Sequence, residues 1–302
     1  MVGDWREWVA SAVGSGASVV RARRLHGGIT SLVHAVDVDD VEGRRHRLVL
    51  RRYPEAPWPD EDPADLVELE VRSLERLAAA GVAGTPRLVA ADPDGVGAGV
   101  PATLSTRLVG RPVLGPDDAM RWAEDLATTV LDHLEAMRAV DPGPLPPYRS
   151  WHPLDDEGAV EPPSWVEDAD TWRQAMGTVA AAIPPTAAPV QAIHRDLNPG
   201  NVLWHRGRTV GIVDWLHLCV GPVEEDVGRC RVNIALLAGL GPADQFLETI
   251  TAAGLQYERR WDLAVLADMA TSLAGMLAAN HLGAALTTEL VHERAEAIVR
   301  AV

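Results

Sequence analysis

Three oxygen-bearing side chains stand on predicted tight turns near the middle of the chain. Asp196 and Asn201 lie in IHRDLNPGNVL at 193–203, and Asp214 follows in GIVDW at 211–215. A carboxylate on a rigid loop can accept the proton of a hydroxyl nucleophile, and an amide and a second carboxylate offer the hard oxygen ligands that Mg²⁺ prefers. These residue types at this spacing are suited to phosphoryl transfer. Taken singly, Asn201 could instead cap a helix, and either aspartate could stabilise a turn.

Cationic chemistry in this protein has to come from arginine or histidine. The pooled count of 27 Lys and Arg residues consists of arginine alone, because no lysine occurs between Met1 and Val302. Without an ε-amine, the chain cannot form a Schiff base, attach pyridoxal phosphate, use a lysine base or build the Gly-Lys-Ser/Thr phosphate loop. A phosphate-binding cation would therefore be a guanidinium group or an imidazole.

The charge balance of the chain is strongly acidic. Forty-three Asp and Glu residues against 27 arginines give a net charge of −16, which repels nucleic acids and anionic membranes and attracts cationic ligands. Residues 1–14 do not read as a signal peptide, and no apolar run approaches the roughly 18 to 20 residues that span a bilayer. Cys219 and Cys230 are too few for a disulfide framework. We expect a cytoplasmic protein with no nucleic-acid or membrane partner, and nothing in the sequence indicates its oligomeric state.

The elements that must position these side chains change in character along the chain. Apolar spacing predicts an antiparallel meander near the N-terminus and mainly helices after Gly110, and thus an α+β enzyme with two unequal lobes. The boundary is expected between an N-terminal lobe at 1–107 and a C-terminal lobe at 108–302. Helices are predicted at 5–13, 65–80, 117–140, 166–182 and from about 226 onward, and strands at 19–25, 31–39, 46–52, 88–91, 102–108, 190–193 and 210–213.

The segment around Asp196 resembles the catalytic loop of the eukaryotic protein kinase-like fold. The Pro-Gly-Asn ending and the Val-Asp-Trp at 213–215 are closer to the aminoglycoside phosphotransferase and choline kinase branch than to protein kinases, whose Asp-Phe-Gly and Ala-Pro-Glu motifs are absent. The His-Arg-Asp at 194–196 has the protein-kinase form, however, since antibiotic kinases more often carry a small residue in its middle. The resemblance covers about residues 25–231.

This resemblance implies a bilobal fold with a small antiparallel-sheet N-lobe that binds the nucleotide and a large, mainly helical C-lobe for catalysis and acceptor binding. It assigns Asp196 as the catalytic base and Asn201 and Asp214 as ligands of Mg²⁺, with ATP or GTP as phosphate donor. His194 would be a buried support of the catalytic loop, and Asp226 would anchor the backbone of that loop.

The nucleotide would be bound by a glycine-containing loop and a strand cation. Backbone amides at Gly27 and Gly28, with the hydroxyl of Thr30 or Ser31, could face phosphate oxygens, although a plain hairpin turn explains the two glycines equally well. Where the family usually places lysine, this chain offers Arg51.

A helix glutamate should hold this cation, and Glu70 is the natural partner of Arg51. Arg52 competes for the role, and a solvated surface arginine and glutamate are the plain alternative. The hinge that joins the two lobes is expected at 104–110, where main-chain groups at positions such as Ser105 and Arg107 would hydrogen-bond to the nucleotide's base.

The acceptor is the least specified part of the sequence. Glu224 and Glu225 could bind an ammonium group, although a solvated acidic run would look the same, and Trp215 is the aromatic candidate for acceptor contact. The branch and the acidity favour an aminoglycoside-type antibiotic or a related cationic acceptor, and hence a role in antibiotic resistance. A housekeeping kinase acting on a choline-, sugar- or amino-acid-type metabolite and a nucleotide-binding pseudokinase are the alternatives.

Overall fold

The computed structural model describes residues 3–25, 31–55, 62–112, 118–149, 161–182, 190–270, 273 and 286–302. The chain forms two compact units. The sheet unit consists of Met1–Val109 together with Val210–His217, and the helical unit consists of Gly110–Thr209 and Leu218–Val302. The short segment at 210–217, called the return segment below, folds with the N-terminal part of the chain, so the sheet unit is not one continuous stretch of sequence.

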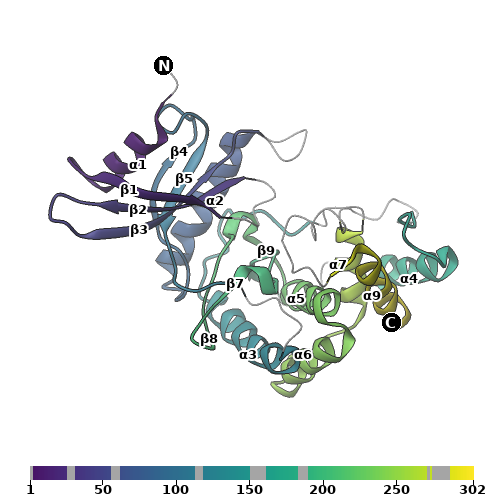
Figure 1. Ribbon diagram of the computed structural model, residues 1–302. Coiled ribbons are helices and arrows are strands. Elements are labelled where there is room, and N and C mark those ends of the chain that lie inside the picture. The colour runs from purple at the N-terminus through teal and green to yellow at the C-terminus, as the bar shows by residue number, and fades with distance from the viewer. Residues whose placement is uncertain are drawn as a thin grey trace. The chain divides into compact units, whose positions relative to one another are not determined.

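The sheet unit is built on five antiparallel strands in the order β1-β2-β3-β5-β4 (Figure 1). The meander predicted for the first three strands is therefore confirmed, and with it the small antiparallel-sheet unit of the expected fold. The bounds of its elements are α1 Trp5–Val13, β1 Ser18–Arg24, β2 Leu32–Asp39, β3 Arg45–Arg52, α2 Pro63–Ala79, β4 Leu88–Asp92 and β5 Ala102–Thr106.

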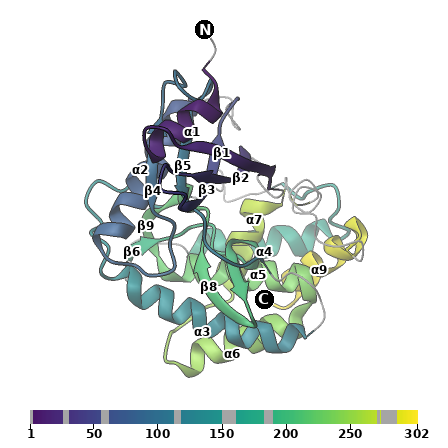
Figure 2. The same cartoon turned by 60° about the vertical axis from the view of Figure 1, so that its left-hand side comes forward.

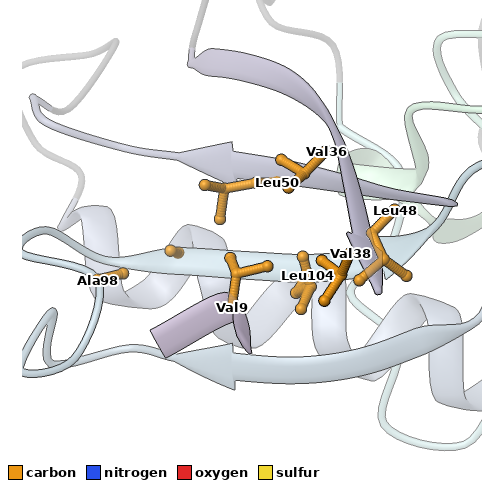
Figure 3. Close-up of a cluster of buried hydrophobic side chains, with 8 residues drawn as sticks. Val9, Val36, Val38, Leu48, Leu50, Ala98 and Leu104 are labelled. Carbon is orange, nitrogen blue, oxygen red and sulfur yellow. The ribbon is translucent and has the colours of Figure 1, made fainter. Parts of the chain in front are cut away.

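Strand register gives this sheet one apolar and one polar face. Because successive side chains of a strand point to opposite faces, the pairing of Leu50 with Leu104 and of Arg51 with Thr103 puts these two pairs on opposite sides. Val9 of α1 packs onto the apolar face (Figure 3). The core on that face consists of Val9, Val36, Val38, Leu48, Leu50, Ala98, Ala102 and Leu104. Arg51 and Thr103 thus lie away from this core.

Helix α2 carries a buried acidic residue among apolar ones. It begins with Asp62 as N-cap, whose carboxylate accepts a hydrogen bond from the amide of Ala64 at 2.9 Å, and with Pro63 in the first turn. Glu70 is buried on the same helix as Leu66 and Leu74. A buried carboxylate needs hydrogen-bonding or charged partners, so Glu70 must have a polar environment inside the unit.

The return segment is held to the sheet unit by close backbone contact. The amide of Ile212 donates to the carbonyl of Gly84 at 2.9 Å. A Cβ on Gly211 would come within 2.4 Å of the same carbonyl oxygen, so only glycine fits there. Leu216 then packs into a cluster with Tyr53, Leu66 and Val67, and this docking places Asp214 in the sheet unit.

The helical unit is built around α5, whose residues are mostly buried. Strands β6 and β9 pair antiparallel, β7 pairs with β8, and α3 and α6 lie side by side (Figures 1 and 2). None of the helices in the described part of the chain is long and apolar enough to cross a membrane. The remaining elements are α3 Ala119–Met137, α4 Ala169–Ala182, β6 Val190–Ile193, η1 Pro199–Asn201, β7 Val202–His205, β8 Arg208–Ile212, η2 Trp215–His217, β9 Cys219–Pro222, α5 Val223–Ala238, α6 Leu240–Ala252, α7 Arg260–Met269 and α9 Thr288–Arg300.

The turn after β4 supplies a test of the sheet unit. The buried carboxylate of Asp92 accepts hydrogen bonds from the amides of Val96, Gly97 and Ala98 at 3.1, 2.8 and 2.6 Å. Asp92→Ala removes both carboxylate oxygens, and with them all three hydrogen bonds, and should lower the free energy of unfolding by roughly 2 kcal/mol, as measured by urea denaturation. The exposed neighbour Asp94 is the control, and Asp94→Ala should change stability by less than about 0.5 kcal/mol. Equal effects of the two variants would contradict this account.

Candidate functional site

The polar face of the sheet unit carries an arginine between two carboxylates. Nη1 of Arg51 lies 2.7 Å from Oδ1 of Asp214 and 3.6 Å from Oε1 of Glu70. These residues come from β3, the return segment and α2. The structure therefore brings together the strand cation, the helix glutamate and one expected metal ligand. Asp214 has a positive φ of 68°, a backbone conformation that non-glycine residues adopt infrequently and that is enriched at functional sites.

Arg51 stays charged in this environment. Burial by itself would lower the pKa of its guanidinium, but Asp214 and Glu70 hold that pKa well above its ordinary value. Its Nη1 atom makes the contacts to Tyr53, Asp214 and Glu70, and Nε and Nη2 have no hydrogen-bond partner among the described residues. Two N–H-bearing nitrogens of the guanidinium fork thus remain for an anionic ligand.

Arg52, the competing candidate, points to the opposite side of the sheet. Its guanidinium carbon lies 5.3 Å from the centre of the Trp5 ring on α1. Burial lowers the pKa of Arg52, and no carboxylate opposes that effect. Alternation along β3 therefore decides between the two neighbours, because only Arg51 shares a face with Glu70.

The other expected nucleotide contacts fall partly outside the described residues. Gly27, Gly28 and Thr30 are not described. Ser31 is buried, and its hydroxyl has no hydrogen-bond partner among the described residues. Ser105 is buried on the same face of β5 as Thr103.

Arg107 is held within the sheet unit. Its Nη2 donates to Oδ1 of Asp37 at 2.7 Å, and its amide donates to the carbonyl of Arg47 at 2.9 Å. The guanidinium is therefore already paired, and a contact to a nucleotide base is left to the main chain of this segment.

In the helical unit, the loop after β6 is fixed by a buried carboxylate. Asp226, in the first turn of α5, accepts hydrogen bonds from the amides of His194 and Arg195 at 2.8 and 2.7 Å. Arg195 has a positive φ of 68°, a conformation that costs about 1 to 3 kcal/mol for such a side chain. Its guanidinium donates to the carbonyl of Arg149. The loop is held in this conformation from both sides.

The loop presents a carboxylate with a fixed orientation. Nδ2 of Asn201 donates to Oδ2 and to the backbone carbonyl of Asp196 at 3.0 and 2.8 Å. Nδ2 of Asn198 donates to Oδ1 of Asp196 at 3.2 Å, while its own Oδ1 accepts from the amide of Gly200 at 2.8 Å. Asp196 remains half-buried. A substrate can therefore reach its carboxylate, whose orientation is fixed by the two asparagines.

Asn201 and Asp214 remain the predicted ligands of a magnesium ion. Asn201 uses its Nδ2 for hydrogen bonding, and its Oδ1 accepts no hydrogen bond from the described part of the chain, so an amide oxygen is left for a metal. The described residues contain no group of three or more His, Cys, Asp or Glu side chains placed to hold a metal. Mg²⁺ does not need such a cage, because it usually takes one or two protein ligands and completes its shell with water and substrate phosphates.

Beneath the loop lies a buried group of two histidines and Asp226. His194 is fully buried, and its Nδ1 accepts from the amide of Asp196 at 3.2 Å. Burial raises the pKa of Asp226 to about 6, against the opposing effects of His194 and the two backbone amides. Burial, with the charge of His194, lowers the pKa of His133 to about 3. His133 is therefore neutral, so its 4.0 Å separation from Asp226 is not an ion pair.

Two of the three expected acceptor contacts are buried in the structure, which corrects the sequence interpretation. Trp215 is 1% exposed, and its indole N–H donates to the carbonyl of Ile212 at 2.9 Å. Glu225 is 0% exposed and engaged by Tyr148 and Arg229. Trp215 is buried by packing within the sheet unit, and Glu225 is buried as the charge partner of Arg229 within the helical unit.

Glu224, the third expected contact, is only half-buried. Its Oε2 has no hydrogen-bond partner among the described residues, and burial raises its pKa. It remains a predicted acceptor contact.

Sequence reasoning missed a buried cation near Asp196. Nη2 of Arg229 pairs with Oε1 of Glu225 at 2.7 Å and with Oδ2 of Asp268 at 3.1 Å. Burial would lower the pKa of Arg229, but Glu225, Asp196 and Asp268 raise it above its ordinary value. The four-residue spacing of Glu225 and Arg229 on a helix signals that pair, whereas nothing in the sequence indicates Asp268.

The buried histidine gives this unit a specific acid sensitivity. Unfolding lets His133 take up a proton below about pH 6.5, whereas the folded protein keeps it neutral down to about pH 3, so stability falls as the pH drops through this range. Between pH 7 and 5, wild type should lose about 2 kcal/mol more unfolding free energy than His133→Gln, measured by denaturant titration. The raised pKa values of Asp226 and Asp262 act in the opposite direction in both proteins. His205→Gln, at an exposed site, should follow wild type; identical pH dependence in all three proteins would refute the assignment.

Comparisons with known proteins agree with this architecture. Residues 21–264 match the phosphotransferase enzyme family, APH, whereas no curated protein matches the sequence significantly. Among solved structures, a type I macrolide 2′-phosphotransferase is 17% identical with a TM-score of 0.61, covering 97% of this chain and 96% of its own. The GDP and kanamycin complex of an APH(2″) enzyme is 17% identical with a TM-score of 0.60 and 94% coverage of each chain.

A thermostable mutant of aminoglycoside phosphotransferase APH(4)-Ia, in a ternary complex with ADP and hygromycin B, is 17% identical with a TM-score of 0.61 and 98% coverage of each chain. At these identities the structural likenesses establish the shared kinase-like fold, and the family match extends over most of the chain. The resemblance drawn from the catalytic loop is confirmed: this chain belongs to the phosphotransferase enzyme family and transfers phosphate to a hydroxyl group.

Proposed function

We propose that this small-molecule kinase transfers the γ-phosphate of ATP or GTP to a hydroxyl group of a cationic acceptor, of which an aminoglycoside-type antibiotic is the best candidate. The observation that carries the proposal is the geometry of Asp196. Two amide side chains fix its carboxylate, on a loop whose backbone is held by Asp226. A carboxylate held in this way can accept the acceptor's proton without first reorganising.

The sheet unit supplies the donor-binding side chains of the proposal. Arg51 offers Nε and Nη2 to phosphate oxygens while Asp214 and Glu70 hold its other nitrogen. A guanidinium that remains charged and forked can replace the usual lysine, with two directed hydrogen bonds instead of one point charge. The buried hydroxyl of Ser31, at the end of the expected phosphate loop, is a further hydrogen-bond donor for phosphate oxygens.

Asn201 and Asp214 are the residues that would hold Mg²⁺. When bound, the ion neutralises charge on the phosphate oxygens during transfer. Asn201 has a second task in the proposal, since its Nδ2 orients Asp196 while its Oδ1 is left for the ion. The two roles fit one side chain because an amide is a donor at one end and an acceptor at the other.

The distribution of charge supports a cationic acceptor. The helical unit holds 26 of the 43 acidic residues but only 14 of the 27 arginines, so it carries most of the net charge of −16. A unit with a net negative charge attracts cations and raises their concentration near its surface. Glu224 adds a half-buried carboxylate with an unpaired oxygen. The structural neighbours include complexes with kanamycin and with hygromycin B, which makes amine-bearing antibiotics the first acceptors to test.

The role of Asp196 predicts a separation of chemistry from binding. Asp196→Asn keeps the shape of the side chain but removes the base, so kcat should fall by roughly 10² to 10⁴ while the dissociation constant for a non-hydrolysable nucleotide changes less than about threefold. Asp132→Asn, at an exposed position of α3, is the matched control and should retain the wild-type rate. A kcat near wild type for Asp196→Asn would remove Asp196 from the mechanism.

A panel of acceptors tests the cationic class. Purified enzyme with ATP or GTP and Mg²⁺ should release nucleoside diphosphate in the presence of kanamycin or hygromycin B, and turnover should weaken as salt screens the acidic field. A macrolide and choline complete the panel. Turnover on an uncharged sugar, with none on amine-bearing acceptors, would overturn the acceptor class and favour a metabolite kinase. Nucleotide binding without turnover on any acceptor would favour the pseudokinase alternative.

A further inference from the structure

The carboxylate of Glu70 is held mainly by two hydroxyl groups. Its Oε2 accepts hydrogen bonds from Oγ1 of Thr103 at 2.6 Å and from the hydroxyl of Tyr53 at 3.1 Å. Its Oε1 lies 3.6 Å from Nη1 of Arg51, which is an ion-pair distance but too long for a hydrogen bond. Tyr53, Thr103 and Glu70 are all buried. The two hydroxyl groups therefore fix the position of the Glu70 carboxylate more firmly than its direct contact with Arg51 does.

The tyrosine hydroxyl stands between the two charges. It lies 3.1 Å from Oε2 of Glu70 and 3.5 Å from Nη1 of Arg51. Burial and the charge of Glu70 raise the pKa of Tyr53 well above its ordinary value, so the hydroxyl stays protonated and donates a hydrogen bond to Glu70. Its oxygen then accepts from the guanidinium. The result is a directed chain from Arg51 through Tyr53 to Glu70, with Thr103 fixing its far end.

The sheet places both hydroxyls next to Arg51. Tyr53 follows Arg51 by two residues, and Thr103 is the cross-strand partner of Arg51 in the β3–β5 register. Asp214 fixes Nη1 of Arg51 by one hydrogen bond at 2.7 Å, about which the guanidinium can still turn, and the contact of the same nitrogen with the Tyr53 hydroxyl restricts that turning.

We propose that Tyr53 and Thr103 are positioning residues for the phosphate donor, which lock Glu70 and thereby aim Nε and Nη2 of Arg51 at the nucleotide phosphates. This inference rests on the proposed function, because it assumes that Arg51 binds the donor. It assigns a task to two buried side chains that act through Arg51. The task arises from the use of arginine, since an ammonium group has no orientation to fix.

Substitutions that remove single hydroxyls test the proposal. Tyr53→Phe and Thr103→Val should each weaken binding of a non-hydrolysable nucleotide by about five- to tenfold in calorimetric titration, with kcat at saturating nucleotide and the KM of the acceptor within about twofold of wild type. Thr103→Ser keeps the hydroxyl and should restore wild-type affinity. Ser73→Ala is the control, because this buried hydroxyl on α2 bonds only the carbonyl of Leu69, at 2.8 Å. Unchanged affinity in both Tyr53→Phe and Thr103→Val overturns the proposal.

A double-mutant cycle shows whether the tyrosine acts through the arginine. In an Arg51→Gln background the guanidinium is absent, so adding Tyr53→Phe should change nucleotide affinity by less than about twofold. An equal and additive penalty in both backgrounds would mean that Tyr53 serves only packing, and would overturn the inference. Thermal melting identifies any variant that fails to fold, and Thr103→Val with its serine rescue then decides alone.

The same titrations separate this inference from the proposed function. If wild type binds nucleotide and the hydroxyl variants bind it equally well, the positioning role fails while the kinase proposal stands. If wild type binds no nucleotide, the proposed function fails and the positioning role fails with it. Binding that weakens as expected, without turnover on any acceptor, supports the positioning role and rejects the proposed acceptors.

Discussion

The ion pair between Arg51 and Asp214 joins residues 163 positions apart, and the arrangement of the sheet unit depends on it. A buried guanidinium without anionic partners would cost several kcal/mol, so β3 can carry this residue only where carboxylates reach it. One carboxylate comes from α2 and the other from the return segment. The close approach of Gly211 to Gly84 lets that segment dock. The buried Arg51 thus requires that both α2 and the return segment pack against β3.

A comparable constraint governs the helical unit. Asp226 is fully buried, and the rise in its pKa records the cost of removing a carboxylate from water. That cost is offset by two backbone amides at the start of the catalytic loop. The bonds hold Arg195 at a positive φ, and the loop can then turn Asp196 toward its two amide partners. The buried carboxylate of Asp226 therefore helps to orient the candidate base, Asp196, by holding the backbone of its loop.

The strong acidity of the chain has two components in the structure. Some carboxylates compensate buried arginines: Arg229 is paired with Glu225 and Asp268, and Arg231 with Asp262 and Asp244. The pairs with Asp244, Asp262 and Asp268 join α5 to α6 and α7, and all of these pairs leave little charge for a ligand. The remaining surplus is concentrated in the helical unit. Net charge therefore favours a cationic acceptor only through the carboxylates that internal arginines do not use.

The sequence by itself determined the meander of the first three strands, the catalytic loop and the class of reaction, because alternation and turn chemistry are local properties. It also confined any phosphate-binding cation to arginine or histidine. Only the tertiary structure showed that Arg51, and not Arg52, lies beside Glu70. Neighbouring side chains of a strand point to opposite faces of the sheet, and strand pairing sets which of these faces packs against α2. The tertiary structure likewise buried Trp215 and Glu225 and brought Tyr53 and Thr103 to Glu70. Those outcomes depend on desolvation and on contacts between distant segments, which no local pattern encodes.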